Sequence, residues 1–290
     1  MVLVTGATGN FGKAVIDFLL AKGVDPQGIA ALVRNMDRAG NLWDTGINLR
    51  VGSYEDQNSL LRAFQGIDRL LLVSGNEVST RSAQHSNVVR AAVGSGVEHI
   101  FYTSFSRRDE TQRSPLWRVA QSHLQTEKWL LESGIGHTIL KNNLYMDSIP
   151  AFVGADVLRT GRIYFPAGKG KVSAGLRREY AEATANLLVS KGHKNKTYDL
   201  TNAEAYGFDR VAAHISELSG REIKYVSPSL DEYTHTLIEA GVPAEFVTIS
   251  GNFAQAQAQG ELDLVSGDLE KLLGRKPTSI KDFLTSVYTQ

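Results

Sequence analysis

The chain contains no cysteine among its 290 residues. This absence excludes disulfide bonds, thiolate nucleophiles and any zinc or iron–sulfur site that uses cysteine ligands. Net charge is absent too, because 31 lysine and arginine residues balance 31 aspartate and glutamate residues. A surface without net charge has no long-range attraction for nucleic acid or anionic lipid, so we expect neither as a partner. A small molecule is the expected partner.

Long hydrophobic runs are also missing, since no segment approaches the roughly 18 consecutive apolar residues of a membrane-spanning helix. The N-terminal stretch MVLVTGATG has no basic region before its few apolar residues, unlike a secretion signal. We therefore expect Met1 to begin a soluble, cytoplasmic protein. With 42% hydrophobic residues, the chain can bury one large core, or a main core and a smaller one.

Short apolar runs without polar alternation recur over residues 1–201 and are separated by segments with helical periodicity. Strands of a parallel sheet show such runs, because helices cover both faces of the sheet. We predict strands over 1–6, 28–34, 47–52, 69–75, 99–105, 137–142 and 196–201. We predict helices over 10–22, 56–65, 79–95, 116–133 and 177–191, with helix-ending glycines at Gly23, Gly66, Gly96 and Gly134. The predicted fold class is α/β, with a Rossmann-type, doubly wound parallel sheet.

From residue 203 onward this alternation gives way to helix-rich sequence, with one predicted strand in EIKYVS. The segment 143–171 leaves the sheet after the sixth predicted strand and is expected to cross to a smaller domain before it returns. We therefore predict a dinucleotide-binding domain over 1–148 and 172–202. A smaller, helix-rich domain on the substrate side is predicted over 149–171 and 203–290.

A glycine-rich turn, TGATGNFG, follows the first predicted strand and precedes an amphipathic helical segment. Such a turn needs glycine because it uses unusual backbone angles, leaves bare backbone for a pyrophosphate and packs the helix close to the strand. A plain tight turn is the alternative, but the order strand, turn, helix favours dinucleotide binding. The predicted cofactor-binding residues of this motif are Gly6, Thr8, Gly9, Asn10, Phe11 and Gly12.

The end of the second predicted strand indicates which dinucleotide is bound. Proteins that bind NAD usually carry Asp or Glu there to accept hydrogen bonds from the ribose 2′-hydroxyl, whereas this chain has Arg34. A guanidinium group there matches a 2′-phosphate instead. Arg38 is a second candidate, and Asp37 is expected to be a solvated charge. The predicted cofactor is NADP(H), and the alternative is that Arg34 is an ordinary surface arginine.

Polar residues follow the next three predicted strands, at the sheet edge where open α/β sheets bind ligands. Those after the third strand are expected near the adenine, although Asp56 is equally well the N-cap of the next helix. Those after the fourth are expected under the nicotinamide ribose. The hydroxyls of Thr103 and Ser104 after the fifth either face the ligand or satisfy their own backbone. The predicted contact residues at these three ends are Ser53, Tyr54, Ser74, Gly75, Thr103 and Ser104.

With these motifs in place, the chain resembles the NmrA-like group of atypical short-chain dehydrogenases/reductases. Within that group it resembles the type 2 NAD(P)H:quinone oxidoreductases and the triphenylmethane dye reductases. The resemblance runs nearly end to end and is carried by TGATGNFG, ALVRN, LRVGSYED, LLLVSG, QHSNVVRAAVGSGVEHIFYTS, HLQTEKWLLESGIGHTILKNNLYMD, GHKNKTYDLTN and DLEKLLGRKPTSIKDFL. It implies an NADPH-dependent reductase of quinones or related conjugated electrophiles. The alternative, also found in this group, is a catalytically silent NADP(H) sensor that binds a partner protein.

The chain departs from one feature of the wider superfamily. Members with alcohol-dehydrogenase chemistry carry a Tyr-x-x-x-Lys pair on the helix after the fifth strand, but here the matching positions hold His123 and Glu127. Lys128 is one residue out of register and points about 100° away around the helix. The usual proton relay is therefore absent. Quinone reduction tolerates this loss without a covalent intermediate, because hydride transfer gives a stabilised phenolate that water can protonate.

Three roles stay open for His123: a weak proton donor, a structural pair with Glu127, or half of a metal site. Since no third ligand is visible, we predict no metal. A quinone reductase also needs donors that hold the substrate oxygen, and NNLYMD supplies Asn142 and Tyr145. The predicted catalytic residues are Asn142, Tyr145 and His123.

Other residues are expected in lesser roles. Members of the group usually carry Arg where Lys141 stands, so we assign it no role. The sequence leaves the oligomeric state open, with a homodimer as one alternative. The further candidates are Asn143 as a second amide, Phe105, Trp117 and Phe152 as aromatic walls or plain core, and His85 and Asn87 as residues that support the cofactor cleft.

Overall fold

The structure is a computed structural model that describes residues 1–289. The chain divides into two compact units. The first unit comprises Met1–Phe105, Arg118–Asn142 and Arg177–Asp199, and the second comprises Ser106–Trp117, Asn143–Leu176 and Leu200–Gln290. The segment Ser106–Trp117, which the sequence analysis included in the dinucleotide-binding domain, therefore clusters with the second unit.

A seven-stranded sheet in the order β3-β2-β1-β4-β5-β6-β8 forms the centre of the first unit. Its strands are β1 (Val2–Val4), β2 (Ile29–Val33), β3 (Asn48–Val51), β4 (Arg69–Leu72), β5 (His99–Phe105), β6 (Gly136–Asn142) and β8 (Lys196–Leu200). The pairs β1–β2, β2–β3, β1–β4, β4–β5 and β5–β6 are parallel. The strand order reverses between β1 and β4, which makes the carboxyl ends of these two strands the expected ligand site. The predicted doubly wound α/β fold is confirmed.

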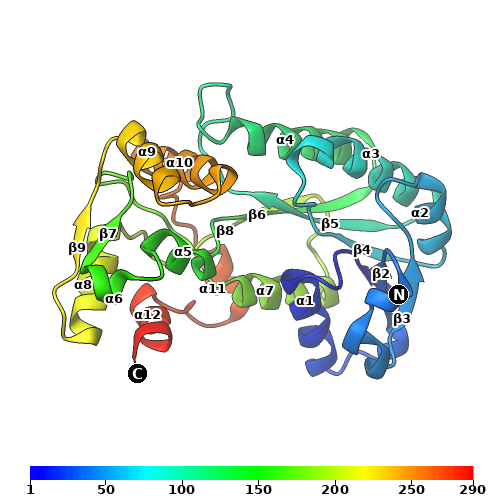
Figure 1. Cartoon of the computed structure of the whole chain (residues 1–290). Coiled ribbons are helices and arrows are strands. Elements are labelled where there is room, and N and C mark those ends of the chain that lie inside the picture. The colour runs from blue at the N-terminus through cyan, green and yellow to red at the C-terminus, as the bar shows by residue number, and fades with distance from the viewer. Residues whose placement is uncertain (290) are drawn as a thin grey trace. The chain divides into compact units, whose positions relative to one another are not determined.

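Helices cover both faces of this sheet (Figure 1). They are α1 (Asn10–Ala21), α2 (Gln57–Ala63), α3 (Val78–Gly94), α4 (Trp117–Glu132) and α7 (Arg177–Val189). Helices α1 and α7 pack on one face, and α2, α3 and α4 lie on the other. The predicted helix-ending glycines all have positive φ, with 78° at Gly23, 72° at Gly66, 74° at Gly96 and 72° at Gly134.

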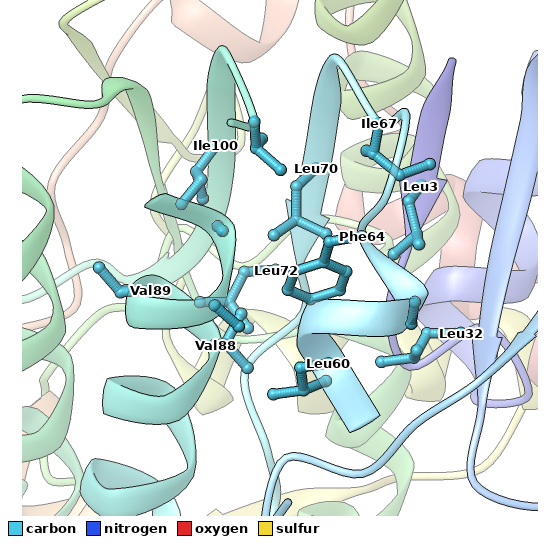
Figure 2. Close-up of a cluster of buried hydrophobic side chains, with 14 of the residues drawn as sticks. Leu3, Leu32, Leu60, Phe64, Ile67, Leu70, Leu72, Val88, Val89 and Ile100 are labelled. Atoms are coloured by element: carbon cyan, nitrogen blue, oxygen red, sulfur yellow. The ribbon is translucent and has the colours of Figure 1, made fainter. Parts of the chain in front are cut away.

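The core between the sheet and helices α2 and α3 explains why the strand sequences are apolar without alternation. Figure 2 shows Leu3, Leu70 and Leu72 of the strands packed around Phe64, which follows α2. All four of these side chains are fully buried, and burial of one such side chain contributes about 1.5 to 3 kcal/mol. Because the opposite face of the sheet is also covered, neighbouring strand residues are apolar on both sides.

The second unit is richer in helices. It contains α5 (Ile149–Val153), α6 (Val157–Thr160), α8 (Phe208–Ser219), α9 (Leu230–Glu239), α10 (Ala244–Ala258), α11 (Asp268–Leu273), α12 (Ile280–Tyr288) and a two-stranded parallel sheet of β7 (Arg162–Tyr164) and β9 (Lys224–Val226). Its aromatic core centres on Phe165, whose ring lies 5.0 Å from Phe152 and 4.6 Å from Phe208. The sequence analysis missed α5, α6 and β7 in the segment 143–171, where each element is short, and it gave no range for α10, which lacks a regular apolar stripe.

Short 3-10 helices complete the chain at Pro26–Gly28, Met36–Arg38, Gly40–Thr45 and Met146–Ser148. Within residues 1–289, every helix is too short or too polar to cross a lipid bilayer.

Candidate active site

The glycine-rich turn joins β1 to α1 at the point where the strand order reverses. Gly6 has a φ of 58°, and its carbonyl accepts a hydrogen bond from the Gly9 N–H over 2.9 Å. A Cβ at Gly12 would overlap the carbonyl oxygen of Gly6, so the helix approaches the turn as closely as backbone allows. Gly9 is the N-cap of α1 and provides no side-chain bond to the first-turn N–H groups. This cradle of bare backbone and uncapped donors fits a dinucleotide pyrophosphate.

The other residues of the motif divide between surface and core. Thr8 and Asn10 are exposed beside the turn, whereas Phe11 is 6% exposed and packs on the inward side of α1. Thr8 and Asn10 are thus open to a ligand through their side chains, and Phe11 only through its backbone.

Two exposed arginines follow β2. Arg34 and Arg38 have no side-chain hydrogen bond or ion pair within residues 1–289, and Asp37 is exposed beside them. Asn35 caps the short helix Met36–Arg38 by accepting a hydrogen bond from the Asp37 N–H over 3.0 Å. Both guanidinium groups are therefore available for a phosphate.

The residues after β3 mostly brace the site. The hydroxyl of Tyr54 lies within hydrogen-bonding range of Thr5 Oγ1 and 2.9 Å from the carbonyl oxygen of Val73, so it links the ends of β1 and β4. Burial raises the pKa of the Tyr54 hydroxyl, more than the hydrogen bond to Thr5 lowers it. Asn87 donates to the Tyr54 carbonyl over 2.9 Å, which is a supporting role like the one predicted for it.

Asp56 is the N-cap of α2 and accepts hydrogen bonds from the N–H groups of Asn58 and Ser59. Ser53 is half-buried, and its N–H donates to Ser59 Oγ over 3.0 Å. Of the two roles left open for Asp56, the structure shows the capping role.

The loop after β4 is held on three sides. The Ser74 N–H donates to Thr103 Oγ1 over 2.8 Å, and the Gly75 N–H donates to His85 Nε2 over 3.3 Å. Arg81 Nε donates to the Gly75 carbonyl over 2.7 Å. His85 and Arg81 of α3 thus bind the N–H and the carbonyl of Gly75. The hydroxyl of Thr103 holds the same loop through Ser74.

His85 is fully buried between α3 and α4. Because Nε2 accepts from Gly75, the neutral ring carries its proton on Nδ1, which lies 2.9 Å from Thr126 Oγ1. Burial, reinforced by the positive charge of Arg81, lowers the pKa of His85 to about 3. His85 is therefore neutral near pH 7 and acts as a fixed hydrogen-bonding bridge.

The helix α4 carries the pair that replaces Tyr-x-x-x-Lys. His123 is 4% exposed, with Nε2 3.2 Å from Arg81 Nη1 and Nδ1 2.6 Å from the hydroxyl of Tyr102. Glu127 is 9% exposed and accepts a hydrogen bond from the Ser104 hydroxyl. The ring orientation of His123 thus comes from Arg81 and Tyr102. No group of three or more potential metal ligands occurs within residues 1–289.

Asn142 ends β6 and is 3% exposed, and neither its amide oxygen nor its amide nitrogen has a hydrogen-bond partner within residues 1–289. Asn143, in contrast, donates to Ser173 Oγ and to the Leu262 carbonyl, each over 3.1 Å. A buried amide without partners is a destabilising group that a ligand or an ordered water can satisfy. Asn142 therefore has the free hydrogen-bonding capacity of a ligand contact, and Asn143 has a structural role within the second unit.

The remaining candidates are spread over both units. Tyr145 is half-buried in the second unit and forms an isolated bridge with Gly175. Phe105 of the first unit lies 6.3 Å from the His123 ring, so it borders the network around that histidine. Phe152 belongs to the aromatic core of the second unit, and Trp117 is half-buried there.

Sequence reasoning missed Arg81 and Tyr102. Arg81 stands four residues before His85 on a predicted helix, so the two share a face, and that face also carries the apolar Val88. A charged residue on an apolar helix face was the available signal. Tyr102 lies inside an apolar strand sequence and gave no such signal.

Comparison with known proteins places these features in context. The profile of the NmrA-like family matches residues 1–284. Quinone oxidoreductase 2 of Escherichia coli is 35% identical over 288 residues, covering 99% of each chain. The crystal structure of that enzyme with NADPH has a TM-score of 0.91 at 34% identity and covers 100% of both chains. The Citrobacter sp. triphenylmethane reductase with NADP(H) has a TM-score of 0.90 at 38% identity and 99% coverage of both chains.

Proposed function

Because the chain belongs to the NmrA-like family, we propose that it is an NADPH-dependent reductase of quinones or of related conjugated electrophiles such as dyes. NADPH supplies a hydride when it is bound. Two relatives support this activity and this cofactor, namely the E. coli quinone oxidoreductase and the Citrobacter dye reductase, whose structures contain NADPH and NADP(H). The substrate is a small molecule, as for these relatives.

The observation that carries the proposal is the engagement of both ring nitrogens of His123. Nε2 accepts a hydrogen bond from Arg81, and Nδ1 lies against the buried Tyr102 hydroxyl. A residue held in this way has no proton directed at a substrate. Reduction of a ketone or alkoxide-forming substrate needs such a proton, whereas a quinone forms a stabilised phenolate that water protonates.

The residues that bind the cofactor follow from the cradle and the free guanidinium groups. We propose that the backbone from Gly6 to Gly12 binds the pyrophosphate and that Arg34, helped by Arg38, binds the 2′-phosphate. We further propose that Asn142 contacts the substrate oxygen once the substrate opens the site, since its amide, sealed from solvent here, has no partner within residues 1–289. A cytoplasmic location and a homodimer stay predictions.

A screen of quinones, triphenylmethane dyes and azo dyes with NADPH tests this function, with loss of the reduced-cofactor absorbance as the readout and NADH as the comparison cofactor. We expect reduction of at least one quinone class, faster with NADPH than with NADH. Tight NADPH binding without reduction of any quinone or dye would contradict the proposal and favour the alternative of an NADP(H) sensor.

A further inference from the structure

Arg81 on α3 is a buried cation without a carboxylate partner within residues 1–289. It is 6% exposed, and its side chain donates only to neutral acceptors. Nε donates to the Gly75 carbonyl, and Nη1 lies 3.2 Å from both Ser122 Oγ and His123 Nε2. A guanidinium group that loses its hydration without gaining a counter-charge destabilises the protein, so an anion would complete this arrangement.

The charged and titratable groups around Arg81 do not provide that anion. On its own helix, the pKa of His85 is lowered to about 3 by burial first and then by the charge of Arg81. On α4, the carboxylate of Glu127 accepts from Ser104 instead. Burial lowers the pKa of Arg81 itself, while Tyr102 on β5 partly opposes this effect. Within residues 1–289, no carboxylate is therefore bonded to the guanidinium group of Arg81.

One nitrogen of Arg81 is free to bind a ligand. Nη2 has no hydrogen-bond partner within residues 1–289. It is not completely buried, because it is absent from the set of unpaired side-chain atoms that solvent cannot reach. The guanidinium group lies between the Gly75 loop and His123, the residue at the position of the superfamily's proton donor. An oxygen anion that reached this position would meet a fixed charge-assisted donor.

We propose that Arg81 forms an anion subsite for phenolates, in which Nη2 donates to the substrate oxygen that becomes negatively charged on reduction. This inference rests on the proposed function. A quinone that takes up a hydride gains two electrons and one proton and becomes a hydroquinone monoanion, with the charge on an oxygen. NADPH supplies the hydride and becomes NADP⁺. Arg81 keeps its proton throughout, and water supplies the proton that completes the hydroquinone.

The test uses 4-nitrophenol, a phenol with a near-neutral pKa whose ionised form absorbs visible light, in complex with the full chain, both with and without NADP⁺. Because no hydride donor is present, the absorbance reports only the ionisation of the bound phenol. We expect the pKa of bound 4-nitrophenol to fall by about one unit or more, which is a roughly tenfold preference for the anion. Arg81→Gln should abolish the shift, Arg81→Lys should keep part of it, and Arg90→Gln, at an exposed position on the same helix, should keep all of it.

A wild-type complex with an unshifted phenol pKa, no detectable binding of 4-nitrophenol, or a full shift in Arg81→Gln would each overturn the subsite. A role of Arg81 in holding the Gly75 loop alone would change NADPH affinity and leave the phenol pKa unmoved. If Arg81→Gln does not fold, NMR of the wild type replaces it. The side-chain signal of Arg81 is assigned as the arginine signal that disappears in Arg81→Lys. This signal must shift when the phenolate is added to the wild type, and a stationary signal overturns the subsite.

Quinone reduction by the wild type, measured in parallel, separates this inference from the proposed function. A chain that reduces quinones without preferring the phenolate refutes only the subsite. A chain that reduces none refutes the proposed function, while the absorbance titration still decides whether Arg81 binds anions.

Discussion

The phenolic oxygen of Tyr102 lies 2.6 Å from Nδ1 of His123. Because Arg81 can only donate to Nε2, the neutral His123 ring carries its proton on Nδ1 and donates it to Tyr102. Tyr102 is fully buried, so this proton points into the core. The side chain at the proton-donor position of related dehydrogenases is therefore part of a buried hydrogen-bond network.

We expect His123→Ala to keep NADPH binding and to reduce kcat far less than the roughly 10²- to 10⁴-fold that removal of a true general acid causes. Its main effect should be on stability, by about 1 to 3 kcal/mol, because Arg81 and Tyr102 lose a buried partner. Steady-state rates, cofactor titration and chemical denaturation measure these effects. His235→Ala, at an exposed position, is the control. A loss of kcat beyond about a thousandfold would show that His123 is a proton donor after all.

The glycines of the turn should separate binding from folding. Gly9 has an ordinary φ of −86°, and an added Cβ would come no closer than 3.3 Å to Gly6 O, so Gly9→Val should fold but fill the space of the pyrophosphate. In Gly12→Ala the Cβ would overlap backbone, so the turn must shift, at about 1 to 3 kcal/mol of stability. Calorimetric NADPH titration and thermal denaturation measure both. Retained NADPH affinity in Gly9→Val would mean that the turn is only structural.

Arg34→Asp should change the cofactor preference from NADPH toward NADH. The substitution removes a charged hydrogen-bond donor worth about 1.5 to 3 kcal/mol, which corresponds to a roughly tenfold to hundredfold loss of NADPH affinity. It also sets a carboxylate against the phosphate, while NADH gains an acceptor for its 2′-hydroxyl. Arg90→Asp makes the same charge change at an exposed position on α3 and is the control. Equal NADPH affinity in Arg34→Asp and wild type would refute the assignment.

His99 begins β5, at the edge of the sheet opposite the glycine-rich turn, and makes the stability of the protein depend on pH. Burial, then the charges of Arg69 and Lys194, lowers the pKa of His99 to about 4. Because the pKa of His99 is lower in the folded protein, the unfolded chain binds more protons than the folded protein does at pH values below the ordinary histidine pKa near 6.5. The contribution of His99 to the free energy of unfolding is therefore fully present above about pH 6.5 and is lost as the pH falls toward 4. The loss is at most about 1.4 kcal/mol per pH unit, and solvent screening makes it smaller.

Chemical denaturation between pH 7 and pH 5 measures this slope. His99→Gln should make the slope shallower, since the amide can still bond to Thr138, the partner of His99 Nε2 at 2.8 Å, but does not titrate. His235→Gln makes the same substitution at an exposed position and is the matched control. An identical slope in His99→Gln and wild type would count against the depressed pKa.

The sequence predicted the sheet well because its strands are buried on both faces, which produces unbroken apolar runs such as RLLL in β4. Capping signals were equally direct: Gly134 ends the α4 region with positive φ, and Asp56 caps α2. One missed element depends on a partner far away in sequence. The three-residue strand β7 forms only because β9, some sixty residues later, pairs with it.

The same distinction holds for the candidate site. The geometry of the glycine turn and the exposed position of Arg34 follow from local motifs, whereas their binding of NADP(H) stays a prediction. The partners of His123 were not, since Tyr102 and Arg81 reach it from another strand and another helix. Hydrogen-bond partners across a fold leave no spacing signature in the sequence, and so the network that holds the His123 ring became visible only in the structure.

Asn142→Ala should lower kcat more than it lowers NADPH affinity, because a hydrogen bond to the substrate oxygen strengthens as negative charge develops. The buried Asn142 amide has no partner within residues 1–289, so its removal leaves no hydrogen-bonding group unpaired there and should not destabilise the fold. We expect a loss of about tenfold to a thousandfold in kcat, the upper limit being that of a full oxyanion donor. Asn143→Ala is the matched control and should instead lower stability, because Ser173 and Leu262 hold its amide. Steady-state kinetics, cofactor titration and denaturation of both variants decide the matter. Unchanged kcat in Asn142→Ala would remove Asn142 from the substrate site, whereas equal losses of kcat and NADPH affinity would assign its amide to the cofactor.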